Sequence, residues 1–543
     1  MRTRTELLLL VAFCGFLFFY GLGAFGLLGA DEPRYAQVAR EMLERRDWIT
    51  PTLQGKPWLE KPVLYYWQAM ASYRVGRALL PAQDQNNDGV TDKAARLPAA
   101  FDAALMIAAI YFFLRRFRPG SEEDGALITA SSAAVIGFAR AAATDMPLAA
   151  AFTIALLGWY AWHESGKRIY LAACYVFLAL GTLAKGPIAP ALAAVIILIF
   201  AAARRDWRIV LRTLWIPGIA IFLAVVLPWY VAAQLRNPEF FRVFILEHNL
   251  VRFSQDLYHH RQPFWFYIPI VLLSLMPWTL WLILAIVERV RLLWSEGKSA
   301  FATAEDSWQL FLLIWLLVPA VFFSASQSKL PGYILPAIPA GALLVSEYLA
   351  ARRTEETRLS PPLAVVHGIL CGLVVFGALS AASIQMNHRL VPGKGTYIAA
   401  VIGLVFALAI AAALLSRRGL RLLRSATMLA VVVSVGIILR LAGPVIDATQ
   451  SARPIAESIQ AFSREPVPIA IYHINRVQEY GLEFYLNRPA QHYEDGHVPT
   501  DAHVLVTAQN SQSQVAQLVP GRRVSSLTSI PAQKLDLYWV GKD

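Results

Sequence analysis

Along most of its length, the chain alternates between long apolar stretches and short polar breaks. A helix that crosses a bilayer needs about 20 mostly apolar residues, and about thirteen windows of that size occur here. The pattern therefore predicts an α-helical polytopic membrane protein with about 13 transmembrane helices. The predicted helices begin near Leu7, Leu97, Gly125, Met146, Ile169, Pro187, Leu214, Phe264, Trp308, Gly332, Pro362, Tyr397 and Ser425.

Lys and Arg test this assignment, because cytoplasmic loops of membrane proteins are enriched in them. Basic residues cluster in alternate gaps, for example at Arg115 and Arg116, at Arg204 and Arg205, and at Arg417. This alternation predicts a cytoplasmic N-terminus and a periplasmic C-terminus. The first apolar stretch lacks a small-x-small cleavage site, so we expect an uncleaved first helix rather than a signal peptide.

The composition agrees with a membrane protein. The chain is 57% hydrophobic and only 16% charged, whereas soluble domains are nearer a quarter charged. Its net charge of +12 follows the predicted loops, so nucleic acid binding is not needed to explain it. Cys14, Cys174 and Cys371 all lie in apolar runs and predict no disulfide framework.

Two predicted outer loops are long, residues 30–96 and residues 234–263. Within the first, Glu32–Arg46 and Pro62–Leu80 have the character of helices. We expect both to lie on the membrane surface, because a further span at Pro62–Leu80 would break the alternation of basic residues.

After about residue 442 the apolar windows end. Residues 443–543 predict a small soluble α/β domain, which follows the membrane domain of residues 1–442. A helix is expected at Arg453–Phe462. Strands are expected at Val467–Ile474, His503–Thr507 and Leu535–Val540, with a further strand at Gly481–Leu486.

Polar residues gather at the outer ends of the predicted spans, where ionisable side chains are costly and indicate function. Six segments contribute, at residues 29–36, 55–62, 140–147, 184–187, 259–263 and 327–333. They supply the carboxylates of Asp31, Glu60 and Asp145. They also supply several cations and Tyr333. Cations can hold a phosphate through charge-assisted bonds, and carboxylates can orient a sugar or act as a base. The mixture suits a lipid-linked sugar phosphate.

Each residue also has a structural interpretation. Asp31 and Asp145 have the position of helix-capping acids, and Lys185 and Lys329 have that of interfacial lysines whose ammonium groups reach the membrane surface. Tyr333 is typical of an aromatic belt. His259 and His260 resemble ordinary loop histidines. Their joint occurrence on one side favours a site.

One segment has the spacing of a metal loop. Asp84–Asp92 matches the first half of a calcium loop, but its twelfth position is Ala95 instead of Glu, which favours a solvated turn. The sequence contains no zinc spacing, Gly-rich phosphate loop or nucleophile elbow, and no cofactor is required by what it does contain.

Several of the outer segments resemble signatures of the bacterial branch of the protein O-mannosyltransferase superfamily, and in particular of aminoarabinosyltransferases that modify lipid A. The resemblance covers the whole chain. The matching segments are Ala30-Asp31-Glu32-Pro33-Arg34-Tyr35-Ala36, Lys61-Pro62, Thr144-Asp145-Met146-Pro147, Leu183-Ala184-Lys185-Gly186-Pro187 and Lys329-Leu330-Pro331-Gly332-Tyr333-Ile334-Leu335-Pro336.

The resemblance implies a type-C glycosyltransferase fold in the bacterial inner membrane, with a periplasmic active site. It also implies that the donor is undecaprenyl-phosphate-linked aminoarabinose and that the acceptor is a phosphate of lipid A. It assigns Asp31, Asp145 and Glu60 as catalytic carboxylates. It implies that the carrier phosphate is bound by Lys61, Arg261, Tyr333 and Lys329. A monomer without a required cofactor is expected, and a divalent metal near Glu60 and His259 or His260 is left open.

The residues leave the role of Asp31 open. A hydroxyl acceptor needs a base, whereas a phosphate acceptor is already anionic, in which case Asp31 orients the amino sugar. Two other functions compete. One is transfer of another sugar, such as mannose, to protein or glycan. The other is a lipid-linked-sugar flippase, although transporters place their polar residues in the middle of the membrane.

Overall fold

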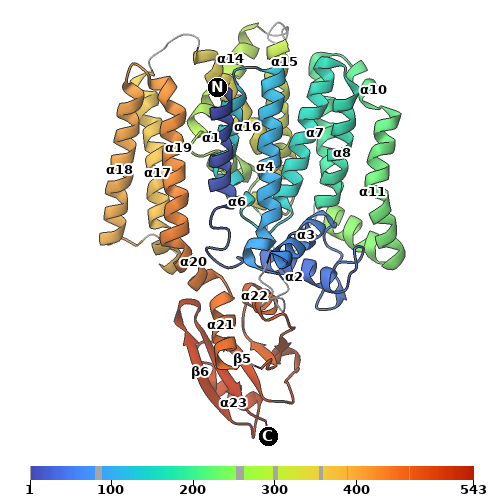
Figure 1. Ribbon diagram of the computed structural model, residues 1–543, viewed down its shortest axis with the longest axis vertical. Coiled ribbons are helices and arrows are strands. Elements are labelled where there is room, and N and C mark those ends of the chain that lie inside the picture. Colours follow the sequence, from blue (N-terminus) through green and yellow to red (C-terminus); the bar gives the residue numbers. More distant parts are fainter. Residues whose placement is uncertain are drawn as a thin grey trace.

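The computed structural model describes residues 2–79, 89–251, 262–296, 304–353, 359–387, 389, 391–463 and 465–542. A large helical bundle carries a smaller α/β domain at one end (Figure 1). The amino-terminal helix begins at the opposite end of the bundle from this domain.

Each of the predicted apolar windows falls on one helix or on a broken pair of helices. The amino-terminal half contains α1 (Arg2–Cys14), η1 (Gly15–Phe19), α4 (Asp92–Phe117), α5 (Glu122–Ala130), α6 (Ala133–Ala139), α7 (Asp145–Ser165), α8 (Arg168–Lys185), α9 (Ile188–Arg204), α10 (Arg208–Thr213) and α11 (Ile216–Arg236). Later come η3 (Phe241–Val251), η4 (Phe264–Phe266), α13 (Tyr267–Ser274), α14 (Thr279–Glu296), α15 (Ala304–Ala325), η6 (Pro331–Ala337), α16 (Ile338–Arg353), α17 (Pro361–Asn387), α18 (Lys394–Leu415) and α19 (Gly419–Ile437).

Within the described residues, 8 helices are long and apolar enough to cross a membrane, or 9 if the bent pair α13 and α14 is one span. Two shorter apolar helices, Thr5–Phe19 and Ile188–Arg204, accompany them. The polytopic helical fold is thus confirmed, and the number of thirteen spans stays a prediction.

Two of the predicted spans are broken, and their breaks meet. Between α5 and α6, the hydroxyls of Ser131 and Ser132 donate to backbone carbonyls one turn earlier, which competes with the helical ladder. Between α13 and α14 the chain bends by 119°. Trp278 at this bend donates to Ser131 Oγ (2.9 Å), and the backbone N–H of Ala133 donates to the carbonyl of Met276 (3.2 Å).

The long loop after η1 forms two helices, as predicted. These are α2 (Asp31–Glu44) and α3 (Leu64–Ala78), joined through a hairpin of β1 (Thr52–Leu53) and β2 (Lys56–Pro57). Both helices lie at the end of the bundle that faces the α/β domain (Figure 1).

The α/β domain contains one five-stranded sheet in the order β4-β3-β5-β7-β6. Strands β3 (Ile469–Tyr472), β5 (His503–Ala508) and β7 (Leu535–Val540) confirm three predicted strands, and α21 (Arg453–Phe462) confirms the predicted helix. Strands β4 (Gln491–His492) and β6 (Val524–Ile530) and helix α23 (Gln512–Leu518) were not predicted. Strand β3 runs parallel to β4 and β5, whereas β7 is antiparallel to β5 and β6.

The strand predicted at Gly481–Leu486 is wrong, because these residues belong to helix α22 (Arg476–Leu486). The alternation of Leu482, Phe484 and Leu486 suggested a strand. A capping box at Asn475 starts a helix instead. The Asn475 side chain accepts from the backbone N–H of Gln478, and the Gln478 side chain accepts from the backbone N–H of Asn475.

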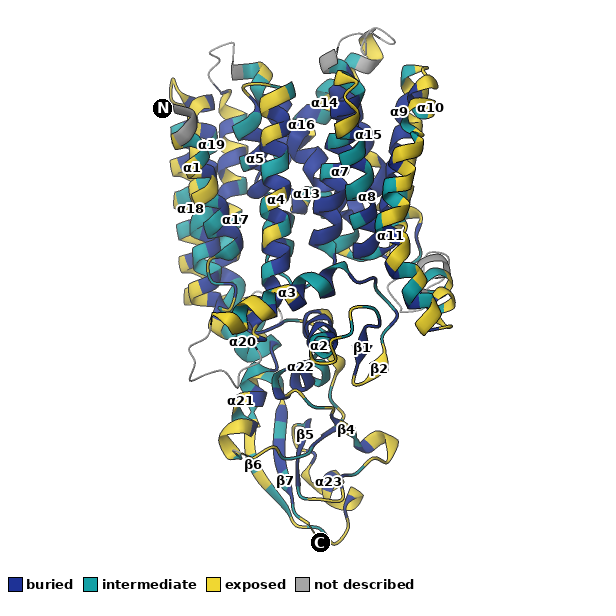
Figure 2. Cartoon of the chain, turned by 45° about the vertical axis from the view of Figure 1, so that its right-hand side comes forward, coloured by how far each residue is buried: buried dark blue, intermediate teal, exposed yellow. Residues whose placement is uncertain are grey.

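Buried residues lie mainly inside the helical bundle, and exposed residues lie mainly on its outer faces (Figure 2). The interior of the bundle is a continuous apolar core, and apolar side chains also cover outward faces, such as Ile216 and Leu235 on α11, each 78% exposed. Such faces are typical of lipid contact. The helical path from α19 continues through η7 (Ile438–Ala442) and α20 (Gly443–Gln450), across the predicted domain boundary at residue 442, which stays a prediction.

Candidate active site

A polar cavity of about 180 Å³ lies where the bundle meets the outer loops. Segments that are far apart in the sequence form its wall, including the start of α2, the loop before α3, the loop before α7 and the end of α8. The lining residues are Asp31, Arg34, Tyr35, Glu60, Lys61, Phe138, Thr144, Asp145, Lys185, Leu330, Gly332 and Tyr333.

Helix α2 presents Asp31 from its first turn, where a carboxylate is favoured by the helix dipole. Its side chain remains 59% exposed and forms an ion pair with Arg34, one turn later. The N-cap residue is Ala30, which makes no side-chain cap bond. The interaction of Asp31 is therefore with a side chain of the cavity, which favours the interpretation of Asp31 as a site residue over a helix cap.

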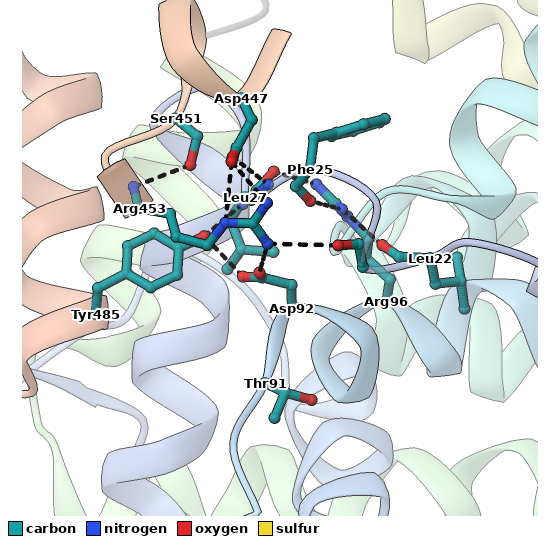
Figure 3. A network of polar contacts seen from close by, with 12 residues as sticks. Leu22, Phe25, Leu27, Thr91, Asp92, Arg96, Asp447, Ser451, Arg453 and Tyr485 are labelled. Atoms are coloured by element: carbon teal, nitrogen blue, oxygen red, sulfur yellow. Dashed lines mark hydrogen bonds and ion pairs between the residues drawn. The ribbon is translucent and has the colours of Figure 1, made fainter. Parts of the chain in front are cut away.

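The neighbouring Glu32 has a structural role. Its buried carboxylate accepts from the backbone N–H groups of Leu28 and Ala142, both at 2.7 Å, and pairs with Arg96 at 2.6 Å. Arg96 also donates to backbone carbonyls of residues 22–26, at 2.8 Å each (Figure 3). This pair joins the segment before Asp31 to the loop before α7, and so fixes two sides of the cavity together.

Asp145 is the first residue of α7, and it faces the end of α8. The Lys185 ammonium donates to Asp145 Oδ1 at 2.6 Å and lies 5.0 Å from the centre of the Tyr333 ring. Gly332 packs so closely here that an added Cβ would lie 2.8 Å from Asp145 Oδ1. The ion pair, the ring and the glycine hold the carboxylate in one place.

The loop before α3 brings Glu60 and Lys61 to the cavity. Its hairpin is anchored because Glu41 accepts from the backbone N–H groups of Gln54 (2.7 Å) and Gly55 (3.1 Å). The Trp58 ring then lies over the Arg34 guanidinium, 4.8 Å from its carbon. Loop and helix are thereby connected at the cavity.

The charges of the cavity balance. Its described lining contains three carboxylates, from Asp31, Glu60 and Asp145, and three cations, from Arg34, Lys61 and Lys185. A small cavity with both signs can bind a ligand that carries both. Its cations can stabilise a phosphate as it leaves, and its carboxylates can pair with an ammonium or accept a proton.

The cavity brings together five of the seven predicted site residues, namely Asp31, Glu60, Lys61, Asp145 and Tyr333. Lys329 lies outside its lining, and its buried ammonium donates to the backbone carbonyl of Ser326 at 2.5 Å. Arg261 lies outside the described residues. The catalytic and binding roles of all seven stay predictions.

Sequence reasoning did not assign Arg34, Tyr35 or Lys185 to the site, although each belongs to a segment that it singled out. Arg34 follows Asp31 by three residues in a helix, which predicts contact on one face. The partnership of Lys185 with Asp145 joins two loops, and no sequence spacing reveals it.

The described residues test only part of the prediction that left a metal site open. Among them, no group of three or more His, Cys, Asp and Glu side chains is arranged to hold a metal ion. His259, His260 and most of Asp84–Asp92, where a metal was considered, lie outside the described residues. We assign no step to a metal.

A second cavity of about 470 Å³ lies on the other side of α6. Its lining is mostly apolar, with contributions from α6, α17 and α19 and from Met276 and Pro277 at the bend before α14. The charged residues at its wall are Glu32, Arg96 and Arg140. Arg140 donates to the backbone carbonyls of Leu17, Tyr20 and Gly21 at 2.9 Å each, so its bonds are made within the protein.

Together, the fold and the polar cavity define a multi-pass membrane protein whose candidate site opens at one end of the bundle. The family model for dolichyl-phosphate-mannose-protein mannosyltransferases matches residues 88–231. Two solved structures of ArnT from Cupriavidus metallidurans have the same fold. The one bound to undecaprenyl phosphate has a TM-score of 0.76 at 21% identity, covering 98% of this chain and 97% of that one. The apo structure has a TM-score of 0.74 at 22% identity, covering 99% of this chain and 98% of that one.

Curated proteins are also similar to this chain. A protein of Pseudomonas aeruginosa (strain UCBPP-PA14), named undecaprenyl phosphate-alpha-4-amino-4-deoxy-L-arabinose arabinosyl transferase, is 31% identical over 395 residues, 71% of this chain. A protein of Pseudomonas fluorescens (strain Pf0-1), with the same name followed by the number 2, is 31% identical over 381 residues, 69% of this chain. The matched stretches span 66% and 65% of these relatives' lengths. Residues 88–231 thus match the model of the dolichyl-phosphate-mannose-protein mannosyltransferase family, and the chain as a whole has the type-C glycosyltransferase fold.

Proposed function

We propose that this protein is a glycosyltransferase that moves 4-amino-4-deoxy-L-arabinose from undecaprenyl phosphate to a phosphate of lipid A. The observation that carries the proposal is the charge-balanced polar cavity at one end of the bundle. The names of the relatives support the donor, and lipid A as acceptor rests on the resemblance of the sequence motifs.

The donor fits the charges of the cavity. An amino sugar on a phosphate carries an ammonium and an anion within one small group. The three cations can pair with the phosphate while the three carboxylates pair with the ammonium. The phosphate of a neutral sugar would need only the cations. This match favours the amino sugar over mannose, the second candidate.

The chemistry follows from these assignments. An oxygen of the acceptor phosphate attacks the anomeric carbon of the sugar, and the bond from that carbon to the carrier phosphate oxygen breaks. The bonding electrons remain on undecaprenyl phosphate, whose growing negative charge Lys61 and Tyr333 stabilise. Asp31 and Asp145 orient the ammonium and the ring of the sugar. Because the attacking oxygen is already anionic, no strong base is needed.

The orientation in the membrane is part of the proposal. Helix α2, which contributes Asp31 to the polar cavity, and the α/β domain lie at the end of the bundle opposite to the start of α1 (Figure 1). With the basic residues on the cytoplasmic side, this end faces the periplasm of a bacterial inner membrane. Cysteine labelling from outside should modify a cysteine at position 255 and spare one at position 298. The reverse pattern would contradict this orientation.

In the decisive experiment, the purified protein is kept as a monomer in detergent and is supplied with undecaprenyl-phosphate-linked aminoarabinose and lipid A. The expected result is a lipid A product heavier by one aminoarabinose, with release of undecaprenyl phosphate. A matched reaction with a mannose-linked carrier tests the second candidate. Movement of the intact donor across vesicle membranes without any product would instead indicate the flippase.

A further inference from the structure

Helix α22 of the α/β domain lies along α2, the helix that begins with Asp31. The Arg40 guanidinium donates to the Phe484 carbonyl at 2.6 Å and lies 4.8 Å from the centre of the Phe484 ring. Gln37 donates to Asn487 at 3.1 Å. The contact is buried and includes a charged group, so it is a built interface between the two domains.

A second contact fixes the segment that leads into α2 (Figure 3). The Tyr485 hydroxyl accepts from the backbone N–H of Leu27 and donates to Asp92, both at 2.7 Å. Arg453 bridges Asp92 (2.9 Å) and Asp447 (2.6 Å). The α/β domain therefore holds the start of the helix as well as its side.

At the cavity, three aromatic rings surround the guanidinium of Arg34. Its carbon lies 4.8 Å from the centre of the Trp58 ring, 5.4 Å from Tyr35 and 5.5 Å from Tyr480, all within the range of cation–π attraction. Trp58 and Tyr35 belong to the outer loops of the membrane domain, whereas Tyr480 belongs to α22. The Arg34 side chain is only 14% exposed, and it pairs with Asp31, which is 59% exposed.

We infer that the α/β domain completes the active site, with Tyr480 as a positioning residue that holds Arg34 in the orientation in which it pairs with Asp31. The inference rests on the proposed function. Without the ring, Arg34 has a wider choice of rotamers, and the ion pair at the cavity is less well oriented. Tyr480 acts through Arg34 and does not itself line the cavity.

Three variants test this role by transfer kinetics. Tyr480→Leu removes the ring and should lower kcat/KM by about three- to tenfold, the range expected for a cation–π contact. Tyr480→Phe keeps the ring and should stay within about twofold of the wild type. Tyr472→Leu is the matched control, because Tyr472 is also half-buried in the same domain but lies on the sheet, in contact with His473 and Tyr493.

A double-mutant cycle with Arg34→Lys separates this route from a general loss of stability. Lysine keeps the charge but loses the planar group that lies against the rings. Once Arg34 is replaced, Tyr480→Leu should cost less than it does in the wild type, because the planar guanidinium that lies against its ring is gone. Equal costs in both backgrounds would contradict the inference.

Amide hydrogen exchange gives a readout that does not depend on activity. The backbone amides of residues 35–38, the first in α2 with partners inside the helix, should exchange faster in Tyr480→Leu than in the wild type, and at the wild-type rate in Tyr480→Phe and Tyr472→Leu. A Tyr480→Leu protein with wild-type transfer and exchange would overturn the inference. Failure of the wild type to transfer the sugar would contradict the proposed function, while the exchange result would still decide the role of Tyr480.

Discussion

The two cavities on either side of α6 use charged residues in different ways. In the polar cavity, carboxylates and cations from separate segments face a common space of about 180 Å³. In the apolar cavity of about 470 Å³, the Arg140 guanidinium and the pair of Glu32 and Arg96 are bonded to the backbone around them. Charged side chains bonded to the backbone around them thus indicate a structural role, whereas carboxylates and cations that pair with one another at a common cavity indicate a candidate ligand site.

The largest effect is expected from Asp31→Asn in the polar cavity. The variant keeps the size of the side chain but loses the charge that orients the sugar, and transfer should fall by about 100-fold or more. A helix cap would instead contribute about 1 kcal/mol of stability. Kinetics and thermal unfolding of the same preparation distinguish the two roles, and an active but less stable variant would support the cap.

Gly332→Ala tests how closely Asp145 must be held. The added methyl group would lie 2.8 Å from Asp145 Oδ1 and 2.9 Å from Phe138, so the carboxylate must move. We expect transfer to fall by about tenfold, since displacements near 1 Å at reacting groups are costly. Gly137→Ala on α6 is the control, because its Cβ would meet no atom within 4 Å and should leave the rate unchanged.

Arg140→Gln makes the same kind of change at the apolar cavity. The three bonds from its guanidinium to backbone carbonyls each contribute about 1.5–3 kcal/mol at most, so the variant should melt at a lower temperature. Its transfer rate per folded molecule should stay within about threefold of the wild type, because the ligand does not use this charge. A stable variant that has lost transfer would break the comparison between the cavities.

The smallest effect is expected from Glu483→Gln, a change outside both cavities that should alter how stability depends on pH. Burial raises the pKa of its carboxyl to about 7, helped by Glu479 and Glu41 and opposed by bonds from Ala490 and Gln54. Its unfolded pKa is about 4.3, so this group's contribution to stability is present at low pH and is lost as the pH rises through about 7. Glu483→Gln should therefore unfold at a higher temperature than the wild type at pH 8, with no such gain at pH 4. Equal differences at both pH values would contradict this assignment.

The sequence predicted the polytopic fold well, because apolar windows and basic loops have strong local signals. It also singled out Asp31, Glu60, Lys61, Asp145 and Tyr333 by their position at the outer ends of spans, and these five side chains line one cavity. The sequence did not predict which residues of different segments contact one another. The contact of Lys185 with Asp145 and that of Tyr480 with Arg34 join residues 40 or more positions apart, and neither has a local pattern.

Local patterns also misled once. The alternating apolar residues after Gly481 suggested a strand, whereas the cap at Asn475 begins a helix six residues earlier. This helix carries Tyr480, so the error hid a neighbour of the cavity. The capping pair of Asn475 and Gln478 is a stronger local signal for a helix here than the alternation is for a strand.

The most direct test of the account is the affinity of free undecaprenyl phosphate for Lys61→Ala and Asp31→Asn. If cations hold the carrier and carboxylates act on the sugar, Lys61→Ala should bind the carrier about tenfold or more weakly, as expected for a lost bond to a charged group. Asp31→Asn should bind it as tightly as the wild type or more tightly, because a negative charge near the phosphate has been removed. Loss of carrier binding in Asp31→Asn with normal binding in Lys61→Ala would contradict the account.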